Sequence, residues 1–173
     1  MKYLKFMLGV MLVLLPMLVY VFWPGAEAQI RKAIKSSIEA AEKGDASGVM
    51  ANVSLNYHDD HGMSYLYLKK IIENEMGRYS DMKVEIDSLK VRVIGEKAYA
   101  SLQVRVIATG PDGSRGYWLG DIDNPFFMEL EMKNEKPRGW KVYSGRYGSA
   151  SAWQKGHTGQ ILSFTLTGAS GLL

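Results

Sequence analysis

The chain opens with an unbroken apolar run. From Phe6 to Trp23 no residue is charged, and only Gly9 and Pro16 are not strongly apolar. At about 1.5 Å of rise per residue, a helix of this length spans roughly 27 Å, close to the roughly 30 Å of a bilayer's hydrocarbon core. We therefore expect a membrane-spanning helix, because backbone groups inside lipid must be paired within the segment.

This segment is either an uncleaved membrane anchor or a cleaved signal peptide. Lys2 and Lys5 precede the run and favour a cytoplasmic N-terminus. We favour an uncleaved anchor, because the run exceeds the roughly 7–15 residues of a signal-peptide core. The alternative is cleavage after Ala28, which forms an A-x-A pattern with Ala26. Either way, we expect the remainder to be periplasmic or extracellular.

Beyond residue 28 the pattern first becomes helical. Apolar residues recur every four positions from Ile30 to Ala41, which indicates an amphipathic helix ending at Gly44. Asp45 predicts the N-cap of a short second helix that runs to about Met50.

A short strand and a third helix are expected next. Apolar residues alternate from Asn52 to Tyr57, as in a strand, and Ser64 is placed to cap a helix. The predicted inner face of that helix consists of Leu68, Ile71, Ile72, Met76 and Tyr79.

After the third helix the period changes to two, which indicates strands. The apolar positions change parity near Asp87, and a β-bulge there would keep one face apolar. Small apolar residues then alternate with polar ones over Ala98–Val106. A Gly-Pro-Asp-Gly turn at 110–113, an interrupted strand region from about Tyr117 to Lys133 and a last strand from Trp140 complete the pattern.

The composition shifts to Gly, Ser, Ala and Thr from Gly148 onwards. The tail has one apolar alternation, at Leu162, Phe164 and Leu166. An edge strand, a cover for a cavity mouth and disorder all remain open for it. The chain thus divides into an anchor or signal segment (1–28), a domain (29–148) and a tail (149–173).

Composition limits the chemistry. The 173 residues include no cysteine, which excludes disulfides and thiolate sites. The chain carries 21 basic and 18 acidic side chains, and residues 1–28 hold two and one of these, so the remainder has a net charge of +2. This near neutrality does not favour nucleic acid. Nucleotide-binding, zincin and hydrolase motifs are also missing from the sequence.

Three short segments carry a family resemblance. They are residues 40–45, which fit A-x-x-x-G-D, the Val53–Tyr57 segment, which contains S-x-x-Y, and Gly-Trp-Lys-Val at 139–142. With the order of elements, they resemble the nuclear transport factor 2-like (NTF2-like, or cystatin-like) superfamily over about residues 29–148. The resemblance implies an α+β fold, in which a curved antiparallel sheet wraps around about three helices and forms a cone with a pocket.

The resemblance implies no single activity. The superfamily includes isomerases, dehydratases, cyclases, secretion components and binding modules. The layout is also similar to that of the membrane-anchored bridging subunit of type IV secretion machines. No catalytic pattern of the superfamily matches this chain residue by residue, and we expect no cofactor.

The most reactive cluster in the sequence is His58-Asp59-Asp60-His61. Asp60 and His61 are candidates for proton transfer, and His58 and His61 for metal ligation. The alternative, which we favour, is that this polar segment only supplies turn chemistry between a strand and a helix.

Strand residues supply further candidates. Arg105 could hold an anionic ligand and Tyr99 a polar one if their side of the sheet were concave. We favour the opposite arrangement, in which the Ala/Leu/Val side packs on the helices. The full set of ligand-binding candidates is Tyr57, Tyr99, Arg105 and Trp118.

Two acidic pairs share strand parity. Asp121 and Asp123 are paired carboxylates, calcium ligands or part of a solvated bulge or loop, and we favour the bulge or loop. Glu129 and Glu131 alternate with apolar residues, which is typical of the solvent face of a strand.

Our preferred hypothesis is a membrane-tethered, extracytoplasmic, non-enzymatic binding or scaffold domain. Its partner would be an envelope protein or a small apolar ligand, and homodimerisation remains open. The alternatives are a cavity enzyme of the isomerase or hydro-lyase type, with Asp60 or His61 as general base, and an accessory subunit of an envelope or secretion complex.

Overall fold

The computed structural model describes residues 25–59 and 62–149. The predicted anchor between Phe6 and Trp23, the candidates Asp60 and His61, and the tail beyond Ser149 lie outside these residues. Within the two described ranges, no helix is both long and apolar enough to cross a membrane. The membrane anchor and the extracytoplasmic location therefore stay predictions.

The described part of the chain begins with helices α2 (Ala26–Glu42), α3 (Ala46–Met50) and α4 (Tyr65–Arg78). The predicted boundary between the first two is confirmed. Gly44 adopts a φ of +69°, which an L side chain rarely adopts, and so turns the chain. The Asp45 carboxylate then accepts a hydrogen bond from the Gly48 N–H at 2.9 Å, as an N-cap does.

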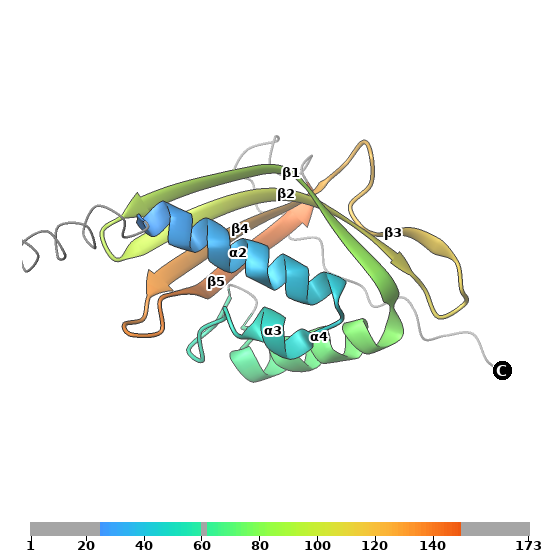
Figure 1. Ribbon diagram of the computed structural model, residues 1–173, viewed down its shortest axis with the longest axis horizontal. Helices are drawn as coiled ribbons and strands as arrows, with labels where there is room; N and C mark the ends of the chain where they lie inside the picture. Colours follow the sequence, from blue (N-terminus) through green and yellow to red (C-terminus); the bar gives the residue numbers. More distant parts are fainter. Residues whose placement is uncertain (1–24, 60–61, 150–173) are drawn as a thin grey trace, which may run out of the picture.

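Five strands form one antiparallel sheet in this part of the chain. They are β1 (Ser80–Ile94), β2 (Lys97–Thr109), β3 (Arg115–Leu119), β4 (Phe126–Asn134) and β5 (Trp140–Ser149). The order is β1-β2-β4-β5, and β3 pairs with the far end of β2. The sheet is curved, and all three helices lie on its concave side (Figure 1). The predicted α+β architecture is confirmed.

The strand pairing shifts register at four points, of which one was predicted. Pairing of β1 with β2 shifts between Ile86 and Ser88, where the parity change indicated a bulge. Pairing of β4 with β5 shifts as well, so that Tyr143 is an extra residue between Val142 and Ser144. The regular alternation predicted for β5 is therefore wrong beyond Tyr143. The extra residue turns Gly145 and Tyr147 to the concave side, opposite Leu130 and Met128.

The core lies between α2 and the concave side of the sheet. Ile30 of α2 is fully buried, as are Ala98 and Ala100 of β2 and Met132 of β4. The apolar alternation predicted for β2 therefore marks the core side. Its polar positions, among them Tyr99, lie on the convex side.

The short strand predicted at Asn52–Tyr57 is wrong. Val53 makes a single parallel bridge to Val142, and the chain then turns, with the Tyr57 N–H donating to the Ser54 carbonyl at 3.0 Å. The alternation misled because Leu55 is 63% exposed, so the apolar positions do not share a buried side.

Candidate functional site

A buried polar cluster lies on the concave side of the sheet. Tyr57 and Asp59 are each only 6% exposed, and Tyr147 of β5 is half-buried beside them. The Tyr147 hydroxyl donates to Asp59 Oδ2 at 3.4 Å, and the Met63 N–H donates to Asp59 Oδ1 at 2.8 Å. We call Tyr57, Asp59 and Tyr147 the inner cluster.

Backbone hydrogen bonds to β5 hold the loop that carries Tyr57 and Asp59. The Ser54 N–H donates to the Val142 carbonyl at 2.9 Å, and the His58 N–H donates to the Tyr143 carbonyl at 3.2 Å. The bulged residue Tyr143 is one of these two attachment points. It thus sets both the position of the loop and the inward direction of Tyr147.

A glycine provides the space for one of the phenols. A Cβ placed on Gly145 would lie 3.2 Å from the Tyr57 hydroxyl and 3.6 Å from Leu130 Cδ2. The first distance is tighter than an ordinary contact, so a side chain here would press on Tyr57. Gly145 therefore contributes to the inner cluster through its lack of a side chain.

The electrostatics of the inner cluster keep its phenols protonated. Burial, followed by the nearby Asp59 carboxylate, raises the pKa of Tyr57 far above its usual value. The same two causes raise the pKa of Tyr147. Both hydroxyls stay protonated at neutral pH. Because Tyr147 donates its one proton to Asp59, the Tyr57 hydroxyl is the donor suited to bind or polarise a ligand oxygen.

The surroundings of the inner cluster are apolar. The Tyr147 ring stacks on Phe126, with ring centroids 6.3 Å apart. Met128 and Leu130 continue this half-buried apolar side along β4. The inner cluster is therefore the polar end of a half-buried apolar side that packs against the core.

None of the residues predicted to transfer protons or ligate a metal is placed in the inner cluster by the described part of the structure. His58 is exposed. Its ring packs T-shaped against Tyr143, with ring centroids 5.1 Å apart, and its Nδ1 lies 3.2 Å from the Asn56 carbonyl oxygen. Asp60 and His61 lie outside the described residues, so their proposed proton-transfer and metal roles stay predictions. Residues 25–59 and 62–149 contain no group of three or more side chains that could hold a metal ion.

The structure does not bring the four ligand-binding candidates together. Tyr57 belongs to the inner cluster, whereas Tyr99 and Arg105 lie on the convex side of β2. Arg105 forms ion pairs with Asp87 and Glu85 of β1, so its charge is already matched. Trp118 of β3 packs against Tyr79, with ring centroids 5.3 Å apart.

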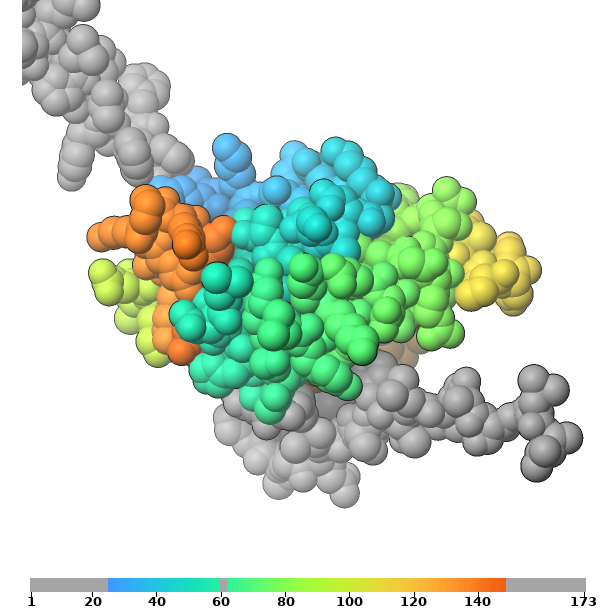
Figure 2. Space-filling model, turned by 90° about the horizontal axis from the view of Figure 1, so that it is seen from below, coloured from blue at the N-terminus to red at the C-terminus, as the bar shows by residue number. Residues whose placement is uncertain are grey.

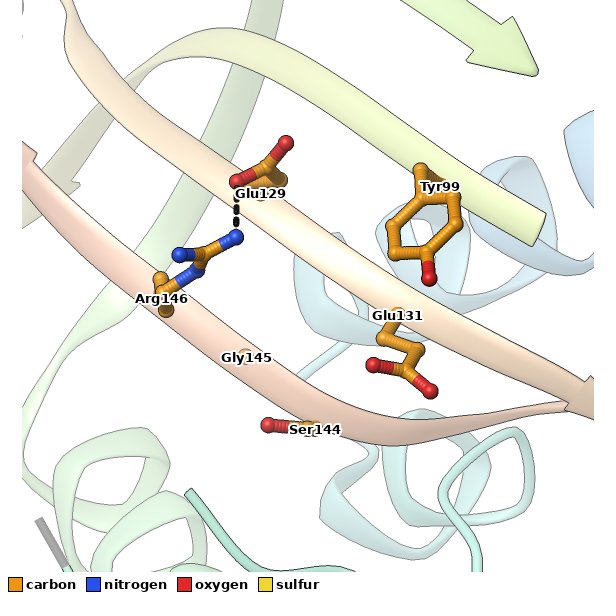
Figure 3. A pocket seen from close by; sticks show the side chains of 6 residues that line it. All are labelled: Tyr99, Glu129, Glu131, Ser144, Gly145 and Arg146. Atoms are coloured by element: carbon orange, nitrogen blue, oxygen red, sulfur yellow. Dashed lines mark hydrogen bonds and ion pairs between the residues drawn. The ribbon is translucent and has the colours of Figure 1, made fainter. Parts of the chain in front are cut away.

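A groove of about 260 Å³ crosses the convex side of β2, β4 and β5. Figure 3 shows Tyr99, Glu129, Glu131 and Arg146 along it. Glu129 pairs with Arg146 at 2.8 Å, and Glu131 pairs with Lys97 at 2.9 Å. Because these charges already compensate one another, the groove offers no unmatched charge to a small ligand.

The acidic pair at Asp121 and Asp123 serves the loop between β3 and β4. The Asp121 carboxylate accepts hydrogen bonds from the N–H groups of Asp123 and Asn124, at 2.9 and 2.7 Å. This turn closure gives Asp121 a structural partner within its own loop.

Sequence reasoning missed the partnership of Asp59 with Tyr147. The sequence favoured turn chemistry for the segment that holds Asp59, and no sequence pattern singled out Tyr147. The S-x-x-Y segment did mark Tyr57, but contact between positions 59 and 147 depends on the bulge at Tyr143.

Comparison with known proteins identifies the fold. No protein-family model and no curated protein matches the sequence. Among solved structures, an NTF2-like superfamily protein from Salmonella enterica serovar Typhimurium has a TM-score of 0.60 at 14% identity, covering 71% of this chain and 89% of its own. The fold is NTF2-like.

Other proteins of NTF2-like fold are similar to the same extent. A candidate dehydratase of the NTF2-like family from Streptomyces avermitilis has a TM-score of 0.58 at 16% identity, covering 69% of this chain and 91% of its own. A ketosteroid isomerase-like protein from Erwinia carotovora atroseptica has a TM-score of 0.55 at 13% identity, covering 71% and 95%. At these identities the likeness establishes the fold and leaves the activity open.

Proposed function

We propose that the domain binds a small, mainly apolar molecule that carries one oxygen acceptor, such as a carbonyl. The observation that carries this proposal is the buried contact between Asp59 and Tyr147, beside Tyr57, at the end of an apolar surface. The apolar part of the ligand would pack along Phe126 and Met128, and its oxygen would accept a hydrogen bond from a phenol.

Binding is favoured over turnover by the hydrogen bonds of Asp59. Both of its carboxylate oxygens already accept a hydrogen bond, from Tyr147 and from the Met63 N–H. A carboxylate held in this way orients the phenol beside it, a positioning role that needs no proton transfer.

The second candidate function is isomerase or hydro-lyase chemistry. It is supported by a buried carboxylate next to two protonated phenols, and by structural neighbours named as a candidate dehydratase and a ketosteroid isomerase-like protein. In this case a phenol would polarise the substrate carbonyl while a carboxylate, Asp59 or the predicted Asp60, moved a proton.

The binding proposal can be tested with 2-naphthol, an apolar bicycle with one oxygen. Fluorescence titration of the full chain in detergent should give saturable binding. Tyr57→Phe should raise Kd about fivefold to tenfold, the effect of losing one hydrogen bond of ~1 kcal/mol or slightly more. Tyr99→Phe is the matched control on the convex side and should leave Kd unchanged.

The outcomes separate the two candidate functions. Absence of binding, or equal effects of the inner and outer tyrosine variants, would contradict the binding proposal. Conversion of a β,γ-unsaturated ketone to its conjugated isomer, followed by absorbance and abolished by Asp59→Asn, would favour the enzyme instead.

We also propose that the N-terminal segment tethers the domain outside the cytoplasm. The support is the uncharged apolar run from Phe6 to Trp23 and the two lysines before it. An envelope protein would then be a second partner, and the paired charges of the convex groove offer a polar surface for one.

A further inference from the structure

The hairpin that joins β1 to β2 exposes apolar side chains at its tip. Val93 and Ile94 are 37% and 54% exposed, and they directly precede the turn at Gly95 and Glu96. Val93 pairs with Ala98, whose side chain belongs to the core, so Val93 lies on the concave side and Ile94 on the convex side. The tip therefore presents apolar surface on both sides of the sheet.

The charge of the domain is concentrated at this end. The turn between β4 and β5 (135–139) lies beside the hairpin, because the Asn134 N–H donates to the Glu96 carbonyl at 3.2 Å. Figure 2 shows the two turns next to each other, in orange and yellow-green. Residues 90–97 and 131–141 carry seven basic and three acidic side chains, a net charge of +4. The rest of residues 25–149 carries eleven basic and fifteen acidic side chains, a net charge of −4.

Four of the cations at this end have no acidic partner. Lys90 and Arg92 of β1 are exposed, and neither forms an ion pair with another described residue. The Arg92 guanidinium lies over the Tyr99 ring instead, 5.9 Å from its centroid. Lys136 and Arg138 of the β4–β5 turn are likewise exposed and without an ion pair to the described residues. Unpaired cations around exposed apolar side chains match an anionic bilayer, which attracts the charges and accepts the apolar tip.

The hairpin extends beyond the start of α2. The two elements run side by side in opposite directions, since Arg31 Nη1 donates to the Leu89 carbonyl at 3.4 Å. Further along, the Val84 N–H donates to Glu42 Oε1 at 3.1 Å. From Arg31 back to its first residue, α2 spans about 8 Å, whereas β1 continues from Leu89 to Ile94 for about 17 Å. The tip thus lies about 9 Å past the start of the helix, at the same end of the molecule (Figure 1).

The predicted anchor ends at a similar distance from α2. Trp23 is three positions before Ala26, the first residue of the helix, so the chain between them spans at most about 11 Å. Trp23 is also the residue expected at the membrane–water interface. A bilayer that holds residues 6–23 would therefore lie within reach of the hairpin tip.

We propose that the β1–β2 hairpin is a membrane-contact site for anionic lipid. Val93 and Ile94 enter the bilayer interface, while Lys90 and Arg92 bind lipid phosphates. The unpaired cations of the β4–β5 turn add to this attraction. The inference rests in part on the proposed tether and goes beyond it, because it assigns the end of the domain that faces the membrane.

The absence of cysteine from the chain allows a single fluorescent label at a chosen position. Ile94→Cys, labelled with the environment-sensitive dye NBD, is placed in the full chain and reconstituted into nanodiscs of phosphatidylcholine with or without phosphatidylglycerol. Nitroxide-labelled lipid should quench this dye more strongly in the discs that contain phosphatidylglycerol. Sodium chloride at about 1 M, which shortens the screening distance to about 3 Å, should remove the difference. Ile122→Cys, at an exposed isoleucine in the β3–β4 loop, is the control and should not be quenched.

Charge variants of the labelled chain test the role of the cations. Lys90→Gln with Arg92→Gln should lower the ratio of docked to undocked hairpin about fivefold for each charge removed. Lys69→Gln with Lys70→Gln removes the same charge from α4 and should leave the ratio unchanged. Glu96→Gln should raise the ratio, because it removes the acidic side chain at the tip.

Three results would overturn the proposal. They are an unquenched dye at position 94 in phosphatidylglycerol discs, equal quenching at positions 94 and 122, and equal effects of the two double variants. Retention of the chain on the discs at high salt scores the tether separately. Quenching at position 94 in low salt without retention in high salt would leave the contact site intact and reject the tether, and retention without quenching would do the reverse.

Discussion

At the scale of single residues, Gly120 shows how closely two strands approach at the junction of β3 and β4. Its φ is +66°, and a Cβ there would lie 2.7 Å from the Phe126 nitrogen and 2.9 Å from the Val104 carbonyl oxygen. Both neighbours are backbone atoms of the sheet, so they cannot yield as a flexible side chain would.

Gly120→Ala should therefore lower the free energy of unfolding by about 2–4 kcal/mol, because backbone strain and a steric clash add. Gly113→Ala is the matched control. It has a φ of +78° but nothing within 4 Å of its Cβ, and should cost only about 1 kcal/mol. Urea denaturation measures both, and equal losses would contradict the close approach.

The raised pKa of Tyr57 predicts that the stability of the fold depends on pH. Because its pKa is raised in the folded protein, the unfolded chain loses this proton first, near pH ~10, and folding becomes less favourable as the pH rises further. The stabilisation is fully present below that pH. Tyr57→Phe should make the decline above pH ~10 shallower and leave the slope between pH 7 and 9 unchanged. Denaturation midpoints over this range measure the effect, and identical slopes in the alkaline range would refute it.

At the scale of elements, α2 is the helix that fixes the core. Ile30→Ala should cost about 2–5 kcal/mol, because a fully buried aliphatic side chain is lost and a cavity remains. Ile122→Ala, at a residue that is 68% exposed, should change stability by no more than ~0.5 kcal/mol. Thermal or urea unfolding distinguishes the two, and a small effect at Ile30 would place the core elsewhere.

The strands show what a sequence pattern can and cannot predict. The bulge near Asp87 was predictable, because valines and isoleucines change parity there. The bulge at Tyr143 was not, because β5 mixes Trp, Tyr, Ser, Gly and charged residues, and either register leaves an acceptable set of side chains on each side.

The inner cluster depends on that second bulge. A turn residue, Asp59, meets a strand residue 88 positions later, and no local pattern encodes such a contact. The fold was therefore predictable from local periodicity and turn residues, whereas the candidate site required the three-dimensional register.

At the scale of the whole molecule, the topology across the membrane is the main prediction. Alkaline phosphatase, which requires disulfides, should be active when fused after Leu173, because those bonds form outside the cytoplasm. A fusion that lacks residues 6–23 is the control and should be inactive. An inactive full-length fusion, together with a fluorescent cytosolic reporter at the same position, would contradict the proposed tether.

The most direct test of the proposed ligand site is NMR of the full chain with 13Cζ-labelled tyrosine. Phenylalanine variants assign the resonances of Tyr57, Tyr147, Tyr99 and Tyr143. Addition of 2-naphthol should shift the Tyr57 signal, because its hydroxyl would donate to the ligand oxygen, and the Tyr147 signal, because its ring lies on the same apolar side. The signals of Tyr99 and Tyr143 should stay in place. A shift confined to Tyr99, or no shift at saturating naphthol, would contradict a binding site at Asp59.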